Sequence, residues 1–277
     1  MKDFLTINDT FIPQILIEEK DFIVVYKPPR MHSSPINNSR KTSVQETTVH
    51  KGSVLDWCSR EYPEIADLHG RKPGEGGLLH RLDYETQGIM LLARTLPGME
   101  ALLEQQKQGK IIKEYSALTS ESETMLPGFP RENPKIPSKD IVSFVTQPVS
   151  QMTQPQFRIT SAFRAYGSGR KVVRPVLEGK PYITEIIETG TVLSGINFFR
   201  LSISKGFRHQ IRCHLAWLGM PIINDDLYGG ISFGNGLLGL RASSISFIDP
   251  ASKKELTYSI PSLVYEMAGP AKLSGAC

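Results

Sequence analysis

The segment from His80 to Gly88 gathers polar and ionisable side chains between two apolar runs. It contains Arg81 and Asp83, and a carboxylate two residues from an arginine can be held ionised at neutral pH. An ionised carboxylate can act as a nucleophile or as a base. Polar loops on a rigid scaffold commonly carry active sites, so this segment is a candidate site. The alternative is a surface turn with a local ion pair.

A second group of ionisable residues lies between Lys205 and His214. The apolar spacing there predicts a helix over 206–218, and Arg208 and Arg212 then lie one turn apart along its flank. Two guanidinium groups in that arrangement can hold a phosphate or fix a buried carboxylate such as Asp83. The alternative is an amphipathic helix with a solvated basic edge.

Metal and cofactor chemistry is not expected from this sequence. On a helix, the spacing of five residues between His209 and His214 points their rings about 140° apart. They also lack the nearby Cys or Glu partners that zinc sites use. The sequence has no GxSxG, GxxxxGK[ST] or strand-following GxGxxG motif, so the corresponding hydrolase and nucleotide-binding sites are not predicted.

A third feature is a basic stretch that is interleaved with glycines and aromatic residues. Its cations are Arg164, Arg170, Lys171 and Arg174. Flexible glycines, cations and aromatic rings together suit a nucleic-acid backbone and unstacked bases. The alternative is the solvated turn of a basic β-hairpin.

The elements around these groups predict an α+β fold with a mixed, mainly antiparallel central sheet. We expect a strand leading from the glycines at 76 and 77 into His80, a polar turn, and a second strand. Thr95 caps a helix with an apolar stripe of Leu96, Met99 and Leu103, and Gly109 ends it. Further strands are predicted at 22–26, 89–93, 111–118, 157–165, 181–188, 198–204, 244–248 and 255–260, and a further helix over 53–60.

Composition restricts the class of protein without choosing a function. Hydrophobic residues make up 40% and charged residues 22% of the sequence, which is ordinary for a soluble globular protein. A net charge of +4 permits a polyanionic partner but does not demand one. No signal peptide is expected, since polar Asn8 and Asp9 come before any long apolar run. No membrane span is expected, since no run reaches roughly 20 apolar residues. Cys58, Cys213 and Cys277 indicate reduced thiols in a cytoplasmic protein.

The motifs resemble those of the RluA-type RNA pseudouridine synthases, in the same order over residues 15 to 262. The family's HRLDxxTSG motif is similar to His80–Gly88, with Gln87 in place of Ser, and its KxYxA strand to Lys113–Ala117. Its HQIRxHxxxxGxPIxxDxxYG block resembles 209–229, in which we match Gly219, Pro221, Ile222, Asp226, Tyr228 and Gly229. Lys27-Pro28 resembles the first motif, and 240–250 resembles the last strand in altered form.

The resemblance implies a fold, a reaction and residue roles. It implies a pseudouridine synthase fold with an RNA-binding cleft lined by Asp83, Tyr115 and Arg212. Asp83 is the catalytic carboxylate, which is proposed in the family to attack either the base or ribose carbon 1. Tyr115 packs on the target base, and Arg212 pairs with Asp83. Neither a metal nor a cofactor is implied. The predicted substrate-binding residues are Arg81, His80, Thr86, Lys113, Arg208, His209, Gln210, Ile211, Arg164, Arg170, Lys171 and Arg174.

The domain organisation expected from this resemblance is one catalytic domain over 15–262, between an N-terminal tail over 1–14 and a C-terminal tail over 263–277. The tail before Ile15 is too short for the S4-type RNA-binding domain of many relatives. We expect substrate recognition to differ at the polar loop over 31–51 and the proline-rich insertion over 120–155. Gln87 and Arg241 depart from the family pattern and concern substrate details.

The expected function is the isomerisation of uridine to pseudouridine in structured RNA by a cytoplasmic monomer. Ribosomal RNA is the first expectation and transfer RNA the second. One alternative is a non-catalytic RNA-binding or RNA-folding protein that uses the same cleft. Another is a glycosidase, which would need a second carboxylate such as Glu85 near Asp83.

Overall fold

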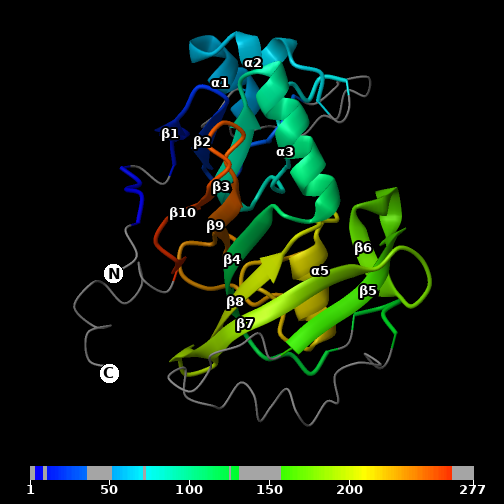
Figure 1. The fold of residues 1–277 in the computed structure, drawn as a ribbon. Helices are drawn as coiled ribbons and strands as arrows, with labels where there is room; N and C mark the ends of the chain where they lie inside the picture. The colour runs from blue at the N-terminus through cyan, green and yellow to red at the C-terminus, as the bar shows by residue number, and fades with distance from the viewer. Residues whose placement is uncertain are drawn as a thin grey trace. The chain divides into compact units, whose positions relative to one another are not determined.

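The computed structural model of the chain divides into two compact units (Figure 1). The first unit consists of Met1–Ile111 and Ile245–Ile260, and the second of Ile112–Ser244 and Pro261–Cys277. The structure describes residues 4–8, 11–35, 52–70, 73–124, 126–130 and 157–263. Most of the predicted loop over 31–51 and of the insertion over 120–155 therefore lies outside the described residues.

The first unit is built on an antiparallel sheet. Strands β1, β2 and β3 lie next to one another in that order, and the last part of β9 follows β3 and also pairs with β10. The elements are β1 (Gln14–Glu18), β2 (Phe22–Lys27), α1 (Val54–Glu61), α2 (Glu64–Asp67), β3 (Gln87–Ala93), α3 (Leu96–Gln108), β9 (Leu240–Ile248) and β10 (Glu255–Ser259).

The core of the first unit lies around β2 and β3, whose residues are all buried. Strands that are covered on both faces need near-continuous apolar sequence, which 22–26 and 89–93 provide. Phe22 and Phe247 meet edge to face with ring centroids 5.0 Å apart. Met99 and Leu102 of α3 pack into the same cluster.

Local sequence signals place α1 and α3 as predicted. The Ser53 and Asp56 side chains form a reciprocal capping box at the start of α1. Thr95 accepts from Gly98 N–H at the start of α3, and Gly109 ends that helix in the left-handed conformation, with φ of 73°. The predicted apolar stripe of α3 is wrong at Leu96, which is 56% exposed, because Met99 and Leu102 supply the buried face instead.

The strand predicted before the His80–Gly88 segment is not formed. Residues 76–79 make one isolated bridge, between Leu78 and Leu92, and the chain then continues in irregular conformation. Gln106 of α3 donates from Nε2 to the Leu79 carbonyl at 2.6 Å, so a side chain bonds the chain where its pairing with β3 ends. The second strand begins at Gln87, two residues earlier than predicted.

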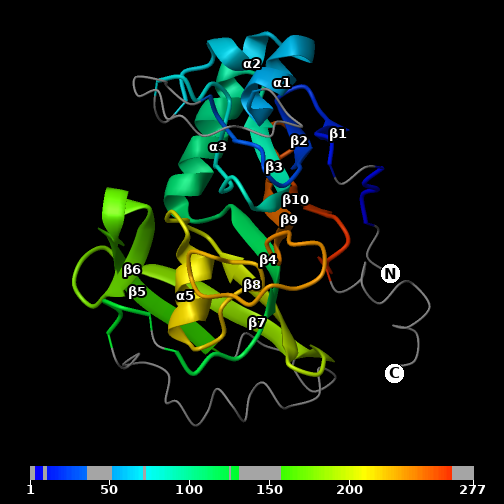
Figure 2. The ribbon, with the colours of Figure 1, turned by 180° about the vertical axis from the view of Figure 1, so that it is seen from behind.

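In the described residues of the second unit, helix α5 (Gln210–Trp217) lies against one face of a sheet (Figures 1 and 2). Its strand order is the first part of β9, then β4, β8, β7, β5 and β6. The views from the two sides in Figures 1 and 2 show α5 lying along this sheet. The elements are β4 (Ile112–Thr119), β5 (Phe157–Tyr166), a 3-10 turn (Ser168–Arg170), β6 (Val172–Val176), β7 (Tyr182–Leu193), β8 (Ile196–Ile203) and α5 (Gln210–Trp217).

A buried polar network ties α5 to the sheet. The two ring nitrogens of His214 lie 2.9 Å from Ser161 Oγ on β5 and 2.8 Å from Thr184 Oγ1 on β7. Gln210 also donates from Nε2 to Thr184 Oγ1 at 3.0 Å. Burial lowers the pKa of His214 from 6.5 to about 3, so its ring is neutral and structural.

The helix predicted over 206–218 begins four residues later, at Gln210. His209 has a φ of 56°, which lies outside the helical region. The Gln210 side chain accepts from Phe207 N–H at 3.0 Å. Arg208 therefore precedes the helix. The prediction that Arg208 and Arg212 lie one turn apart on one helix flank is wrong.

Cys58 and Cys213 are both buried and free. Burial raises the pKa of both thiols, that of Cys58 to about 12, which keeps them protonated. Cys277 lies outside the described residues. Among the described residues, no helix is long and apolar enough to cross a membrane.

Candidate functional site

The loop that carries Asp83 is held in place by residues of the segment that follows β2 in the first unit. The Ser33 hydroxyl donates to the Leu82 carbonyl at 2.8 Å and accepts from Leu82 N–H at 3.0 Å. Met31 N–H donates to the Tyr84 carbonyl at 3.2 Å. The residues on both sides of Asp83 are thus fixed, while the Asp83 side chain stays half-buried.

Lys27 supplies a third tether and a buried cation in the same unit. Its fully buried ammonium group donates to the Pro28 carbonyl at 2.8 Å and to the Tyr84 carbonyl at 3.1 Å. Burial lowers the pKa of Lys27 from 10.5 to about 7, although the nearby carboxylates of Asp83 and Glu85 raise it. Lys27 therefore places its ammonium group beside the loop that carries Asp83.

The Arg81 side chain is turned toward another carboxylate. Arg81 forms an ion pair with Glu75 at 3.4 Å, and its side chain is 55% exposed. The suggestion from the sequence that Arg81 holds Asp83 ionised stays a prediction. Its exposure leaves Arg81 accessible to a ligand.

The other predicted residues of this loop have structural contacts. His80 Nε2 accepts from Leu91 N–H at 3.1 Å, which joins the loop to β3. Thr86 is 2% exposed, and its N–H closes a turn onto the Asp83 carbonyl at 3.1 Å. Tyr26 donates to Gln87 Oε1 at 2.9 Å, so Gln87 serves to hold β3 against β2.

Tyr115 and Lys113 lie in the second unit, on β4. Positions two apart on a strand share a face, so both side chains lie on the same side of the sheet. Tyr115 is 6% exposed and is opposite Leu201 of β8. Lys113 is 4% exposed and donates to the Ser204 carbonyl at 3.1 Å, which fixes the chain just after β8.

Arg212 forms a buried, bidentate ion pair with Asp225. Its Nε and Nη2 donate to the two carboxylate oxygens, both at 2.7 Å, and the two residues are 4% and 0% exposed. The match of Asp226 to the motif's aspartate is wrong, since Asp226 is exposed and Asp225 is the residue bonded to Arg212. The motif's own spacing from His209 also gives Asp225.

Three residues at α5 that were predicted to contact the substrate are buried or bonded within the protein instead. Ile211 is 4% exposed, and Gln210, which is 2% exposed, bonds Ile183 and Thr184. His209 Nδ1 lies 3.2 Å from the Tyr228 hydroxyl. Arg208, in contrast, is exposed and donates to the Arg170 carbonyl at 2.7 Å.

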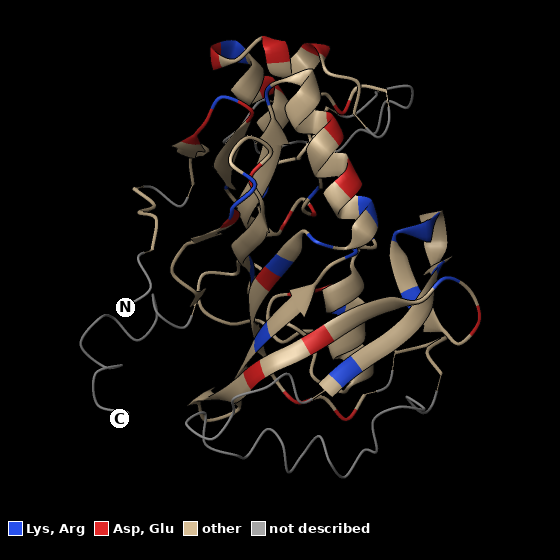
Figure 3. Ribbon diagram, in the orientation of Figure 1, with Lys and Arg blue, Asp and Glu red and all other residues tan. Residues whose placement is uncertain are grey.

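The predicted basic stretch forms a hairpin between β5 and β6, which we call the basic hairpin (residues 157–176). Figure 3 shows Lys and Arg gathered at its tip. Arg164, Arg170 and Lys171 are exposed, whereas Arg174 packs over the Tyr166 ring at 5.2 Å. Arg164 and Arg174 are paired across the two strands, so two cations adjoin. That arrangement concentrates positive charge on one accessible element.

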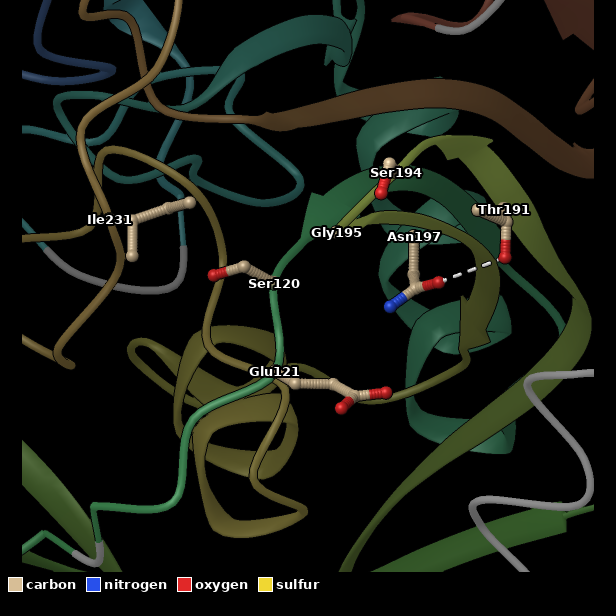
Figure 4. A pocket seen from close by; sticks show the side chains of 7 residues that line it. All are labelled: Ser120, Glu121, Thr191, Ser194, Gly195, Asn197 and Ile231. Atoms are coloured by element: carbon tan, nitrogen blue, oxygen red, sulfur yellow. Dashed lines mark hydrogen bonds between the residues drawn. The ribbon is translucent and has the colours of Figure 1, made fainter.

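A separate pocket of about 510 Å³ opens in the second unit (Figure 4). It is lined by Ser120, Glu121, Thr191, Ser194, Gly195, Asn197 and Ile231. Inside it, Thr191 donates to Asn197 Oδ1 at 3.2 Å. None of the predicted site residues lines it, so it is distinct from the groups described above.

Residues 21–217 match the model of the RNA pseudouridylate synthase family. That match covers more than half of the chain and includes Asp83, Tyr115 and Arg212. The chain belongs to the RNA pseudouridylate synthase family.

The relatives that match include enzymes named ribosomal large subunit pseudouridine synthase D. The chain is 29% identical over 224 residues to the one from Escherichia coli and 26% identical over 218 residues to the one from Pasteurella multocida. Each alignment covers 78% of this chain and 52% of the relative, so the chain spans about half the length of these relatives.

Two solved structures from this family show the same fold. Human RNA pseudouridylate synthase domain containing 1 superposes with a TM-score of 0.56 at 18% identity, covering 93% of this chain and 86% of that chain. Human RNA pseudouridylate synthase domain containing 4 superposes with a TM-score of 0.53 at 19% identity, covering 92% of this chain and 91% of that chain. The pseudouridine synthase fold predicted from the sequence is therefore confirmed.

Sequence reasoning missed the contacts that hold the candidate groups in place. Lys27 was noticed only as part of a motif, although a lysine at the end of a buried strand is itself a signal, since buried lysines need acceptors. Asp225 was passed over for its neighbour. Among the described residues, no group of three or more His, Cys, Asp or Glu side chains has the arrangement of a metal site.

Proposed function

We propose that this chain is an RNA pseudouridine synthase that isomerises specific uridines in structured RNA. Ribosomal RNA is the first candidate substrate, since the matching relatives carry that name, and transfer RNA is the second. The observation that carries the proposal is the Asp83 loop. A half-buried carboxylate stands between two residues whose backbones are fixed by buried Ser33 and Lys27.

The reaction needs no external reactant. The bond between uracil N1 and ribose carbon 1 breaks, the base turns, and carbon 5 forms the new bond. Carbon 5 loses its proton and N1 ends with one, so atoms and electrons balance within the nucleotide. Asp83 acts as the nucleophile, on either the base or ribose carbon 1, because an ionised carboxylate can trap a glycosyl fragment.

Tyr115 and Arg212 assist Asp83 in this proposal. The Tyr115 ring provides an apolar surface for the target base, and its hydroxyl can move a proton. The guanidinium group of Arg212 supplies a positive charge for Asp83. Its own orientation is set by its two hydrogen bonds to the Asp225 carboxylate. Rigid placement of such groups lowers the barrier, since no reorganisation is needed when charge develops.

RNA binding falls to the exposed cations in this proposal. The uridine must leave its stack, which costs a few kcal/mol. Phosphate contacts offset that cost, and the basic hairpin offers Arg164, Arg170 and Lys171 for them. Arg81 and Arg208 are accessible as well. Gln210 and Ile211 are buried, so we leave them out of the RNA contacts.

The remaining expectations follow as parts of the same proposal. The catalytic region is residues 15–262, and the protein acts as a cytoplasmic monomer without a metal or a cofactor. The rival function is RNA binding without catalysis. An RNA-binding protein gains nothing from a carboxylate held beside polyanionic RNA, which favours the enzyme.

The test compares the full chain with its Asp83→Asn and Asp226→Asn variants. Each is incubated with unmodified ribosomal RNA, assembled ribosomal particles and transfer RNA, and pseudouridine is mapped by chemical adduct formation and primer extension. We expect stops at defined uridines with wild type and with Asp226→Asn, but none with Asp83→Asn. Tight RNA binding without stops from any protein would leave the non-catalytic rival as the explanation.

A further inference from the structure

Tyr228 lies where three parts of the second unit meet. It is 1% exposed and follows Asp225 in a turn that its own N–H closes onto the Asp225 carbonyl at 3.1 Å. Its ring lies 5.4 Å from the guanidinium carbon of Arg212. Arg212 is thus held by the Asp225 carboxylate and by the Tyr228 ring, and one short turn carries both groups.

The Tyr228 hydroxyl reaches a different element, strand β6 of the basic hairpin. It accepts from Val173 N–H at 2.9 Å and donates to the Val173 carbonyl at 3.3 Å. Among the described strands, β6 ends the sheet order and pairs with β5. An edge strand leaves N–H and C=O groups pointing outward, and at Val173 one phenol satisfies both. Burial raises the pKa of Tyr228, which keeps this phenol protonated.

Other contacts bring the same elements together. The Cys213 thiol, next to Arg212 on α5, lies 3.5 Å from the Val173 carbonyl. His209 Nδ1 lies 3.2 Å from the Tyr228 hydroxyl, and Arg208 donates to the Arg170 carbonyl. The basic hairpin is therefore fastened to the start of α5, and the Tyr228 side chain contacts both Val173 and Arg212.

We propose that Tyr228 is a positioning residue that couples the basic hairpin to Arg212, a role that rests on the proposed function. Its hydroxyl fixes the hairpin for contact with RNA phosphates, and its ring fixes the guanidinium group of Arg212. RNA that engages the hairpin then also stabilises the working orientation of Arg212.

The first test is Tyr228→Phe, which removes the hydroxyl and keeps the ring. We expect KM for RNA to rise about three- to tenfold, because the hairpin loses both hydrogen bonds between Val173 and the hydroxyl. The kcat value should stay within about twofold of wild type, since the ring still contacts Arg212. Tyr258→Phe, on β10, is the matched control and should change neither constant. A fall in kcat with KM unchanged would overturn the proposal.

A double-mutant cycle separates coupling from a general loss of structure. Arg170→Gln with Lys171→Gln weakens the hairpin's own RNA contacts. If the hydroxyl acts through the hairpin, Tyr228→Phe raises KM much less in that background than in wild type. Equal effects in both backgrounds would show that the hydroxyl acts elsewhere and would reject the coupling.

Hydrogen exchange tests the structural half without any catalytic assay. Tyr228→Phe should speed amide exchange in residues 172–176 and leave β10 unchanged, because the hairpin loses its hydrogen bonds to the hydroxyl, while Tyr228 has no hydrogen bond to β10 in the described part of the chain. Unchanged exchange at 172–176 would contradict the proposal. This measurement stands even if the protein makes no pseudouridine, so a failure of the proposed function can be told apart from a failure of the coupling.

Discussion

The ammonium group of Lys27 donates to the main-chain carbonyl of Tyr84, 3.1 Å away. This contact joins the end of β2 to the residue that follows Asp83. The position of the candidate nucleophile thus depends on a side chain that lies far earlier in the sequence.

Lys27→Met should reduce kcat by about ten- to a hundredfold, because a small displacement of Asp83 is enough to lose that much rate. The free energy of unfolding should change by less than about 2 kcal/mol, since the lost hydrogen bonds are offset by removal of a buried charge. Single-turnover rates and urea unfolding measure the two effects. Lys20→Met, at an exposed position, is the control. A normal kcat in Lys27→Met would mean that the tether does not position Asp83.

The buried, neutral state of His214 predicts that the folded protein loses stability as the pH falls. Its folded-state pKa is about 3, below the ordinary 6.5, so the unfolded chain takes up the proton first. The stability contributed by this group is present above pH 6.5 and is lost as the pH falls toward 3, by about 1.4 kcal/mol per pH unit.

Urea unfolding of wild type and His214→Gln at pH 7.0, 5.5 and 4.5 measures this loss. The difference in stability between the two proteins should shrink at the lower pH values. His69→Gln, which removes an exposed histidine, should follow wild type at every pH. A difference that stays constant with pH would show that His214 is not held neutral.

Asp225 and Asp226 are adjacent but should respond very differently to the same substitution. Asp225→Asn leaves the buried guanidinium group of Arg212 without its charged partner and should cost about 3–5 kcal/mol of stability. Asp226→Asn changes an exposed side chain and should cost less than about 0.5 kcal/mol. Chemical denaturation compares the two variants directly. Similar costs would contradict the assignment of Asp225 as the partner.

Charge reversal on the basic hairpin should weaken RNA binding in a salt-dependent way. For Arg170→Glu with Lys171→Glu, the slope of log affinity against log salt should fall by about one to two, as expected for two lost phosphate contacts. Filter binding at several salt concentrations measures the slope. Lys20→Glu with Lys254→Glu is the control, because it makes the same change in net charge on the first unit and should leave the slope unchanged. An unchanged slope in the hairpin variant would remove the hairpin from the RNA-binding surface.

The fold was predictable where signals are local. The Ser53 and Thr95 caps, Gly109 and the apolar runs of β2 and β3 each act over a few residues, so the pattern and the structure agree. The prediction was wrong where a distant group replaces a local one. The chain before His80 makes a single bridge to β3 and its Leu79 carbonyl is bonded by the side chain of Gln106, and His209 has a left-handed backbone just before α5 begins.

The family, the fold class and the order of the motifs could be read from the amino-acid sequence, because these depend on residue types at fixed spacing. The ion-pair partners became known from the folded chain. Arg81 turns to Glu75, and Arg212 is paired with Asp225. Side-chain directions in loops and across sheets are set by packing between segments far apart in sequence, and no local pattern contains that information.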